Sequence, residues 1–246
     1  MIKQGHVEIF ERINDCSVVT LNILRKELGL PERSYCALKK KILRLEKSGY
    51  IKSYQACSGH EKFLYLADSA FDHFYPEFRK EINPKEVYHD GLVSKICHGF
   101  KTLGLSDELI TEAQGIAQGY ALVPDAINIF EFNGQNHKVA IELELTRKSF
   151  ERIHKKYLEY LEKSQYSRVF YFFTNENLWR LYSKEFQKCC KNRSDSSLKN
   201  ENQDKILFFL LSDIDRVEFS LAGSRVLKNE SEYRFEELFH IQEGTQ

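Results

Sequence analysis

The stretch that decides the fold lies in the middle of the chain. Residues 123–130 read Val-Pro-Asp-Ala-Ile-Asn-Ile-Phe, and residues 139–149 read Val-Ala-Ile-Glu-Leu-Glu-Leu-Thr-Arg-Lys-Ser. A polar turn around residues 133–135, Asn-Gly-Gln, separates these apolar runs, and together they predict a β-hairpin. Because side chains alternate between the two faces of a strand, Glu142 and Glu144 are expected on one face and their apolar neighbours on the other.

Two ionised carboxylates that are buried side by side repel each other and lose their hydration unless a positive group lies between them. A divalent metal ion is the usual solution. Asp125 precedes the first strand of the hairpin and is expected to complete a set of three carboxylate ligands with Glu142 and Glu144. Lys148 follows at a distance suited to contacting a phosphate group. The pattern predicts metal-dependent chemistry on phosphodiesters.

The expected cofactor is Mg²⁺ or Mn²⁺, because both ions accept hard oxygen ligands such as carboxylates. Such an ion polarises the scissile phosphate and lowers the pKa of an attacking water molecule. Glu144 or Lys148 is expected to position that water or to stabilise the charge that develops on the phosphate. A second interpretation stays open, because alternating glutamates are also ordinary on the solvent-facing side of a hairpin.

Other polar residues are weaker candidates for the same site. The acidic ones are Glu86, Asp90 and Glu112. Glu112 is expected near the ion from a strand over residues 109–117, whereas Asp90 also fits a plain N-terminal helix charge. Tyr157 and Tyr160 are candidates for DNA contacts, but their helical spacing favours core packing for Tyr157.

Composition limits the possible functions. The chain has 246 residues with 36 basic and 36 acidic side chains, so any affinity for nucleic acid must come from local patches. No apolar run approaches the roughly 20 residues of a membrane-spanning helix, and the first residues lack the apolar segment of a signal peptide. We therefore expect a cytoplasmic protein with no membrane partner. The six cysteines are scattered without a Cys-x-x-Cys pair, which favours free thiols.

The first quarter of the chain is predicted to bind DNA. Apolar periodicity indicates helices over residues 7–13, 20–27 and 34–47, followed by a hairpin over residues 49–66. This order is similar to that of winged helix-turn-helix proteins, whose recognition helix lies in the major groove. The expected DNA contacts are basic residues on and before the third helix: Arg33, Lys39, Lys40, Lys41 and Arg44. A solvated basic face, or a winged helix used for protein contacts, is the alternative.

The rest of the chain predicts a second domain. The expected elements are a helix over 84–100, a strand over 109–117, the carboxylate hairpin, a helix over 149–165, a buried strand over 168–173, a helix over 177–190 and a buried strand over 205–211. This order predicts an α/β sandwich with a mixed sheet. Residues 192–204 are polar and are expected to form a mobile loop. The predicted domains are residues 1–75 and residues 76–246, in the α+β class.

The motif Pro124-Asp125, Glu142-x-Glu144 and Lys148 resembles that of the PD-(D/E)xK nuclease superfamily, the fold of many restriction enzymes. Glu144 stands where this superfamily usually has lysine, and Lys148 is the residue available to supply the displaced charge. The resemblance implies a restriction-endonuclease-like α/β sandwich. It also implies that Asp125, Glu142 and Glu144 bind the metal and that Lys148 acts with them in catalysis.

The winged helix, this motif and Thr146-x-Lys148-Ser149 together resemble the plasmid replication-relaxation proteins, and most of all the MobC-class relaxases of mobilizable plasmids. The resemblance implies a metal-dependent nickase that cleaves one strand of double-stranded plasmid DNA at an origin of transfer, without an obvious tyrosine nucleophile. It implies accessory mobilization proteins and a coupling ATPase as partners. Two alternatives stay open: a site-specific endonuclease of a transposon or defence system, and a DNA-binding regulator with an inactive nuclease-like domain.

Overall fold

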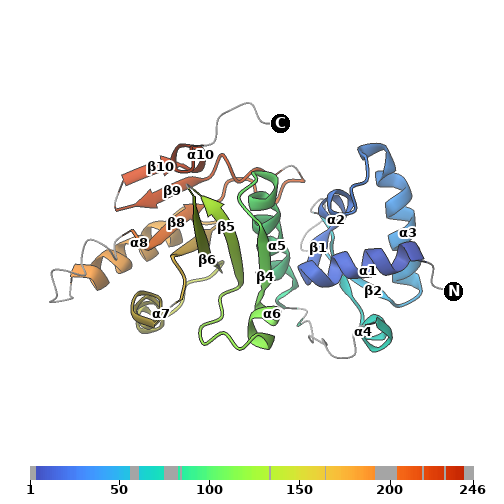
Figure 1. Cartoon of the computed structure of the whole chain (residues 1–246), viewed down its shortest axis with the longest axis horizontal. Helices are drawn as coiled ribbons and strands as arrows, with labels where there is room; N and C mark the ends of the chain where they lie inside the picture. Colours follow the sequence, from blue (N-terminus) through green and yellow to red (C-terminus); the bar gives the residue numbers. More distant parts are fainter. Residues whose placement is uncertain are drawn as a thin grey trace. The chain divides into compact units, whose positions relative to one another are not determined.

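The computed structural model describes residues 4–55, 61–74, 83, 85–132, 134–163, 165–191, 204–217, 219–229 and 231–240. The chain forms two compact units (Figure 1). The N-terminal unit comprises Met1–His98 with Asp215–Phe219, and the C-terminal unit comprises Gly99–Ile214 with Ser220–Gln246. The expected turn at residues 58–59, the helix start at residue 84 and nearly all of the expected mobile loop over residues 192–204 lie outside the described residues.

The N-terminal unit combines helices with a small antiparallel sheet. Its helices are α1 (Gln4–Cys16), α2 (Leu21–Glu27), the 3₁₀ turn η1 (Glu32–Ser34), α3 (Tyr35–Lys47) and α4 (Asp68–Phe74). Its strands are β1 (Val18–Thr20), β2 (Ile51–Tyr54) and β3 (Phe63–Leu66), in the order β1-β3-β2. The predicted helices and hairpin are thus confirmed, whereas β1 was not predicted because it has only three residues.

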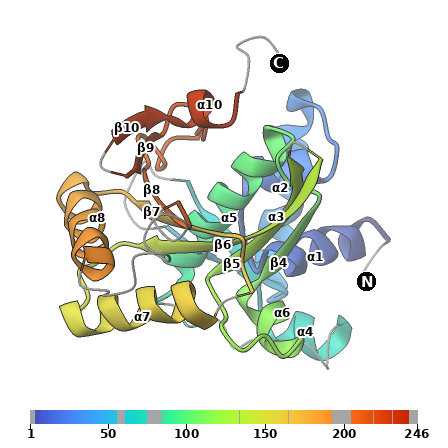
Figure 2. The same cartoon turned by 60° about the vertical axis from the view of Figure 1, so that its left-hand side comes forward.

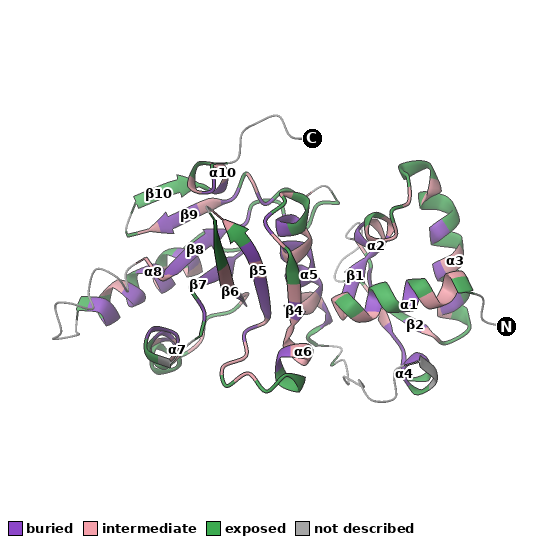
Figure 3. Cartoon of the chain, viewed as in Figure 1, coloured by how far each residue is buried: buried purple, intermediate pink, exposed green. Residues whose placement is uncertain are grey.

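Local sequence explains these elements. Thr20 caps α2, since its side chain accepts a hydrogen bond from the backbone N–H of Ile23 at 3.3 Å. The apolar stripe of α3, which is Leu38, Ile42 and Leu45, is buried in one core with the stripe of α1. Because the apolar side of α3 is buried, the opposite, basic side of the helix is exposed (Figure 3).

Helix α5 (Val87–Thr102) contributes to both units, and the division falls between His98 and Gly99. The predicted domain boundary after residue 75 differs from this division. A buried contact links α5 to other parts of the N-terminal unit. The ammonium group of Lys95 lies 3.0 Å from a carboxylate oxygen of Glu61 and 2.7 Å from the carbonyl oxygen of Arg216. The second of these contacts also holds the segment 215–219 in this unit.

A seven-stranded mixed sheet forms the C-terminal unit. Its strands are β4 (Glu108–Thr111), β5 (Ala126–Phe132), β6 (Gln135–Glu144), β7 (Arg168–Phe173), β8 (Ile206–Leu210), β9 (Arg225–Lys228) and β10 (Ser231–Arg234). They lie in the order β10-β9-β8-β7-β6-β5-β4, in which β6, β7 and β8 are parallel and every other pair is antiparallel. The predicted mixed sheet, carboxylate hairpin and buried strands are confirmed.

Helices cover both faces of this sheet (Figure 1 and Figure 2). On one face, α7 (Phe150–Lys163) and α8 (Glu176–Lys191) pack on aromatic side chains of β7 and β8. On the other face, Phe100 of α5 contacts Phe170 and Phe172 of β7, and α10 (Phe235–Leu238) adds Phe235. Burial on both faces is why β7 is an almost continuous apolar run. None of the described helices is both long and apolar enough to span a membrane.

One prediction for this unit was wrong in detail, and other features were not predicted. Residues 109–117 form only a short strand, because Thr111 starts the helix α6 (Glu112–Ala117) with a capping box to Gln114. The core stripe of α7 contains Tyr160, whereas Phe150 and Leu158 are 42% and 36% exposed. The strands β9 and β10 were not predicted, because they are short and β10 is fully exposed.

Candidate active site

Asp125 is held at the start of the hairpin by the neighbouring strand. It immediately precedes β5, whose first residue, Ala126, pairs with Ile141 of β6. A carboxylate oxygen of Asp125 accepts a hydrogen bond of 2.7 Å from the backbone N–H of Leu143. This bond crosses to β6 and brings Asp125 beside Glu142, as the sequence predicts for the first two carboxylates.

Glu142 is the most buried of the predicted site carboxylates, at 7% exposure. Its side chain faces α7, where two groups meet the same oxygen, Oε1. The hydroxyl of Tyr160 donates a hydrogen bond to it, and the ammonium group of Lys156 lies 3.0 Å away. Both partners come from α7, and neither was assigned a role beside Glu142 from the sequence.

The environment of Glu142 favours its protonated form. Burial raises the pKa of this carboxyl from 4.5 to about 7, and the negative charge of Asp125 adds to the rise. The charge of Lys156 and the hydroxyl of Tyr160 oppose it. A buried acid with a pKa near neutrality, beside a second acid and a lysine, is typical of functional sites.

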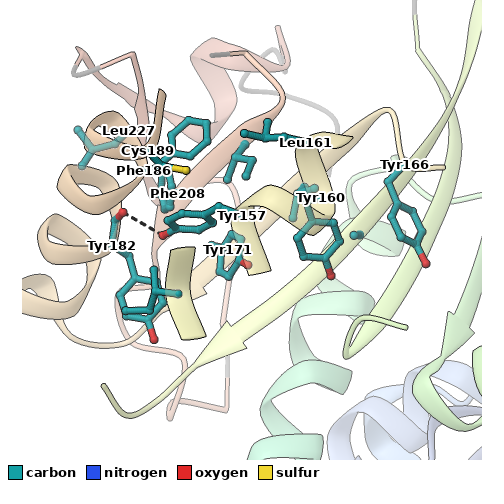
Figure 4. Packing of buried hydrophobic residues seen from close by; sticks show 14 of the residues in the cluster. Tyr157, Tyr160, Leu161, Tyr166, Tyr171, Tyr182, Phe186, Cys189, Phe208 and Leu227 are labelled. Atoms are coloured by element: carbon teal, nitrogen blue, oxygen red, sulfur yellow. Dashed lines mark hydrogen bonds between the residues drawn. The ribbon is translucent and has the colours of Figure 1, made fainter. Parts of the chain in front are cut away.

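Buried tyrosines, including Tyr160, belong to the aromatic core cluster that α7 and α8 form with β7 and β8 (Figure 4). The Tyr157 hydroxyl donates to the carbonyl oxygen of Tyr182 at 2.9 Å, so Tyr157 is a core residue as its spacing predicts. Tyr171 pairs with Glu142 across β6 and β7, and within the described part of the chain its buried hydroxyl has no hydrogen-bond partner. Burial and the charge of Glu142 raise the pKa of Tyr171 well above its usual value.

Glu144 lies at the end of β6 and has partners of its own. Its carboxylate is 3.8 Å from the ammonium group of Lys148. Burial and the charge of Glu144 raise the pKa of Tyr182, whose hydroxyl also accepts a hydrogen bond of 3.3 Å from the backbone N–H of Lys148. Glu144 and Lys148 therefore form one pair, and Glu142 and Lys156 form another.

The residues present fit a divalent ion held by two carboxylates. Within the described ranges, no three acidic, histidine or cysteine side chains come together as a metal-binding group. Asp125 and Glu142 are nevertheless close enough for the charge of one to raise the pKa of the other, and a cation would relieve this repulsion. Mg²⁺ is commonly bound through one or two carboxylates, with water and substrate phosphates as its other ligands.

The weaker candidates take positions that differ from those the sequence predicts. Glu112 is the first residue of α6 and not part of a strand, but it directly follows Thr111, whose strand partner, Ala126, is next to Asp125. Asp90 lies in α5 of the N-terminal unit, where its carboxylate is 3.3 Å from Nδ1 of His89, and Glu86 is exposed just before that helix. Tyr160, proposed for DNA contacts, is fully buried.

The basic residues predicted to contact DNA differ in how exposed their side chains are. Arg33, Lys39, Lys40 and Arg44 are exposed. Lys41 is half-buried, and its ammonium group is 3.4 Å from the place that a β-carbon on Gly5 of α1 would occupy. The outward basic face therefore consists of the four exposed residues, and Lys41 is directed toward α1.

Comparison with protein-family models, with curated proteins and with solved structures finds no match for this chain.

Proposed function

We propose that this protein is a divalent-metal-dependent DNA nickase of the relaxase type, which cleaves one strand of plasmid DNA at an origin of transfer. The observation that carries the proposal is the buried carboxylate of Glu142, with Asp125 beside it and Lys156 3.0 Å away. Two acids from the hairpin and one lysine from α7 supply the groups that phosphodiester cleavage needs.

The order of elements in the C-terminal unit supports this proposal. Helix α5 is followed by the antiparallel strands β4, β5 and β6, then by α7 and by β7, which lies parallel to β6. This order agrees with the restriction-endonuclease-like sandwich that the sequence motif implies. Fold alone does not define activity, so the proposal depends on the site residues.

The roles of the residues follow from their positions. Asp125 and Glu142 would hold Mg²⁺ or Mn²⁺, which supplies charge stabilisation and an acidified water. Lys156 would keep Glu142 ionised and offer a positive charge to the phosphate. Glu144 and Lys148 form the adjacent ion pair, from which either residue would orient the attacking water.

The N-terminal unit would supply affinity for duplex DNA. Its arrangement of three helices, β1 and the β2–β3 hairpin is that expected of a winged helix-turn-helix, with α3 as the recognition helix. The exposed basic side chains of α3 would contact phosphates and base edges. Accessory mobilization proteins, a coupling ATPase and a cytoplasmic location belong to the same proposal.

A nicking assay on supercoiled plasmid with Mn²⁺ or Mg²⁺ tests the function. Wild-type protein should convert supercoiled DNA to the open-circular form, whereas Asp125→Asn and Glu142→Gln should lose this activity by a factor of at least about 100. Glu131→Gln, an exposed change near the turn end of the hairpin, is the control and should cleave normally. Accumulation of linear DNA would instead support a site-specific endonuclease.

One observation favours a second candidate, a DNA-binding regulator with an inactive nuclease-like domain. Among the residues that the structure describes, three metal-ligating side chains do not gather at one point. If wild-type protein binds plasmid DNA but leaves it uncut with either metal, the regulator is the better description.

A further inference from the structure

The start of α7 carries more positive charge than helix stability favours. Residues 147–156 contain five basic side chains and one acidic one: Arg147, Lys148, Arg152, Lys155 and Lys156, against Glu151. Cations near a helix N-terminus interact unfavourably with the helix dipole. Arg152 and Lys156 are four residues apart in α7, a spacing at which like charges on a helix repel, and Lys148 precedes the helix.

Arg152 stands where an acid would stabilise the helix. Ser149 precedes α7, and its hydroxyl accepts a hydrogen bond of 3.3 Å from the backbone N–H of Arg152, the third residue of the helix. A serine cap is commonly completed by glutamate or glutamine at this third position. Arginine in this place departs from the local preference, and such departures concentrate at functional sites.

Two of the three cations pair with carboxylates of β6. Lys148 is 3.8 Å from Glu144, and Lys156 is 3.0 Å from Glu142. Arg152 lies between them in sequence, and its charge acts on the Tyr182 hydroxyl next to Glu144. Arg152 is exposed, and it forms no ion pair within the part of the chain that the structure describes. We name these three residues the cationic edge.

We propose that the cationic edge binds the backbone of a single DNA strand, with Arg152 holding a phosphate next to the one at the Asp125–Glu142 site. Within α7, Arg152 and Lys156 are about 6 Å apart along the helix axis, and Lys148 lies two residues before the helix begins. One row of cations suits one phosphate backbone and not both strands of a duplex. Arginine suits this role because its fork of donors matches a phosphate group.

This inference deepens the proposed function, because it assigns the nicked strand a path across the C-terminal unit. The test measures DNA binding without cleavage. A failure of this inference can therefore be distinguished from a failure of the proposed nicking activity. The probe is a fluorescein-labelled oligothymidylate of about 16 nucleotides, measured by anisotropy in EDTA over a range of salt concentrations. Without divalent metal no DNA cleavage is expected, so the anisotropy reports only how tightly the protein surface binds the oligonucleotide.

The decisive variant is Arg152→Glu, because it should weaken binding while stabilising the fold. It removes a phosphate contact, so Kd should rise about tenfold and the salt slope should fall by about 0.7. It also completes the cap with Ser149 and relieves the like-charge contact with Lys156, so Tm should rise by about 1–3 °C. Opposite movements of affinity and stability cannot come from unfolding.

Lys184→Glu on α8 is the matched control. Lys184 is exposed and is also flanked at four residues by basic side chains, Arg180 and Lys188. This variant makes the same change in net charge and should leave Kd and the salt slope unchanged. If Arg152→Glu binds like wild type, or if both variants weaken binding equally, the inference is overturned. Arg152→Gln provides a second test should Arg152→Glu lower Tm.

Discussion

The ammonium group of Lys156 lies 3.0 Å from Oε1 of the buried Glu142, whereas that of Lys148 lies 3.8 Å from Glu144. The lysine beside the critical carboxylate therefore comes from the second turn of α7 and not from the segment that follows β6. Since α7 also contributes Tyr160 to the same oxygen, the helix and the hairpin form one site.

Lys156→Met should shift the pH dependence of nicking upward. The charge of Lys156 lowers the pKa of Glu142, so its loss should move that pKa further above about 7. A shift of about one unit would reduce the ionised fraction at pH 7 roughly fivefold. The pH profile of kcat/KM measures this. The exposed neighbour Lys155→Met should keep the wild-type profile, and coincident profiles for all three proteins would contradict the assigned role.

Glu142→Gln should stabilise the fold more at pH 8 than at pH 5. The pKa of Glu142 is about 7 in the folded protein, and the ordinary pKa of this carboxyl is 4.5. The protonated carboxyl therefore contributes stability that is fully present below pH 4.5 and is lost as pH rises through 7. The amide of the Glu142→Gln variant does not ionise, so the variant does not lose this stability. Its free energy of unfolding relative to wild type should therefore grow by on the order of 1–3 kcal/mol from pH 5 to pH 8. Urea unfolding at pH 5 and pH 8 measures the difference.

Glu131→Gln, an exposed change on β5, is the control for that experiment and should show no such trend. A stability difference between Glu142→Gln and wild type that stays constant with pH would argue against an ionised Glu142 buried at the site.

Tyr160→Phe should destabilise the protein by about 1–3 kcal/mol, because Glu142 loses a buried donor. It should also weaken Mn²⁺ binding at pH 7, since the lost hydrogen bond raises the pKa of Glu142. Tyr166→Phe removes a comparable hydroxyl, which donates to the carbonyl oxygen of Leu122 at 2.6 Å. Calorimetric metal titration should separate the two variants, because Tyr166→Phe should lose stability but keep its metal affinity. Equal metal affinities would refute the link to Glu142.

Lys40→Ala with Arg44→Ala should weaken binding to duplex DNA and reduce the salt slope by about 1.8, because both residues are exposed on α3. Lys41→Ala should have a much smaller effect, since this side chain is half-buried and directed toward Gly5. Anisotropy titrations with a duplex probe distinguish the variants. If Lys41→Ala proves as harmful as the double change, α3 does not present its outward face to DNA.

Elements with local signals could be predicted from the amino-acid sequence. The alternation of glutamate with leucine and isoleucine defines β6, and the apolar run of β7 defines a strand covered on both faces. Thr20 marks the start of α2, and the stripe of Leu38, Ile42 and Leu45 marks the inner side of α3. These features depend on backbone periodicity and capping within a few residues, so they need no knowledge of the rest of the chain.

Only the tertiary structure decided which side chains meet at the site. Lys156 and Tyr160 are 14 and 18 residues beyond Glu142, and their contacts depend on how α7 is rotated against β6. That rotation is set by packing of Ile153, Tyr157 and Leu161 on the sheet, not by the sequence of the helix alone. The pKa of Glu142 follows from the same packing, because burial and its neighbours' charges exist only in the folded unit.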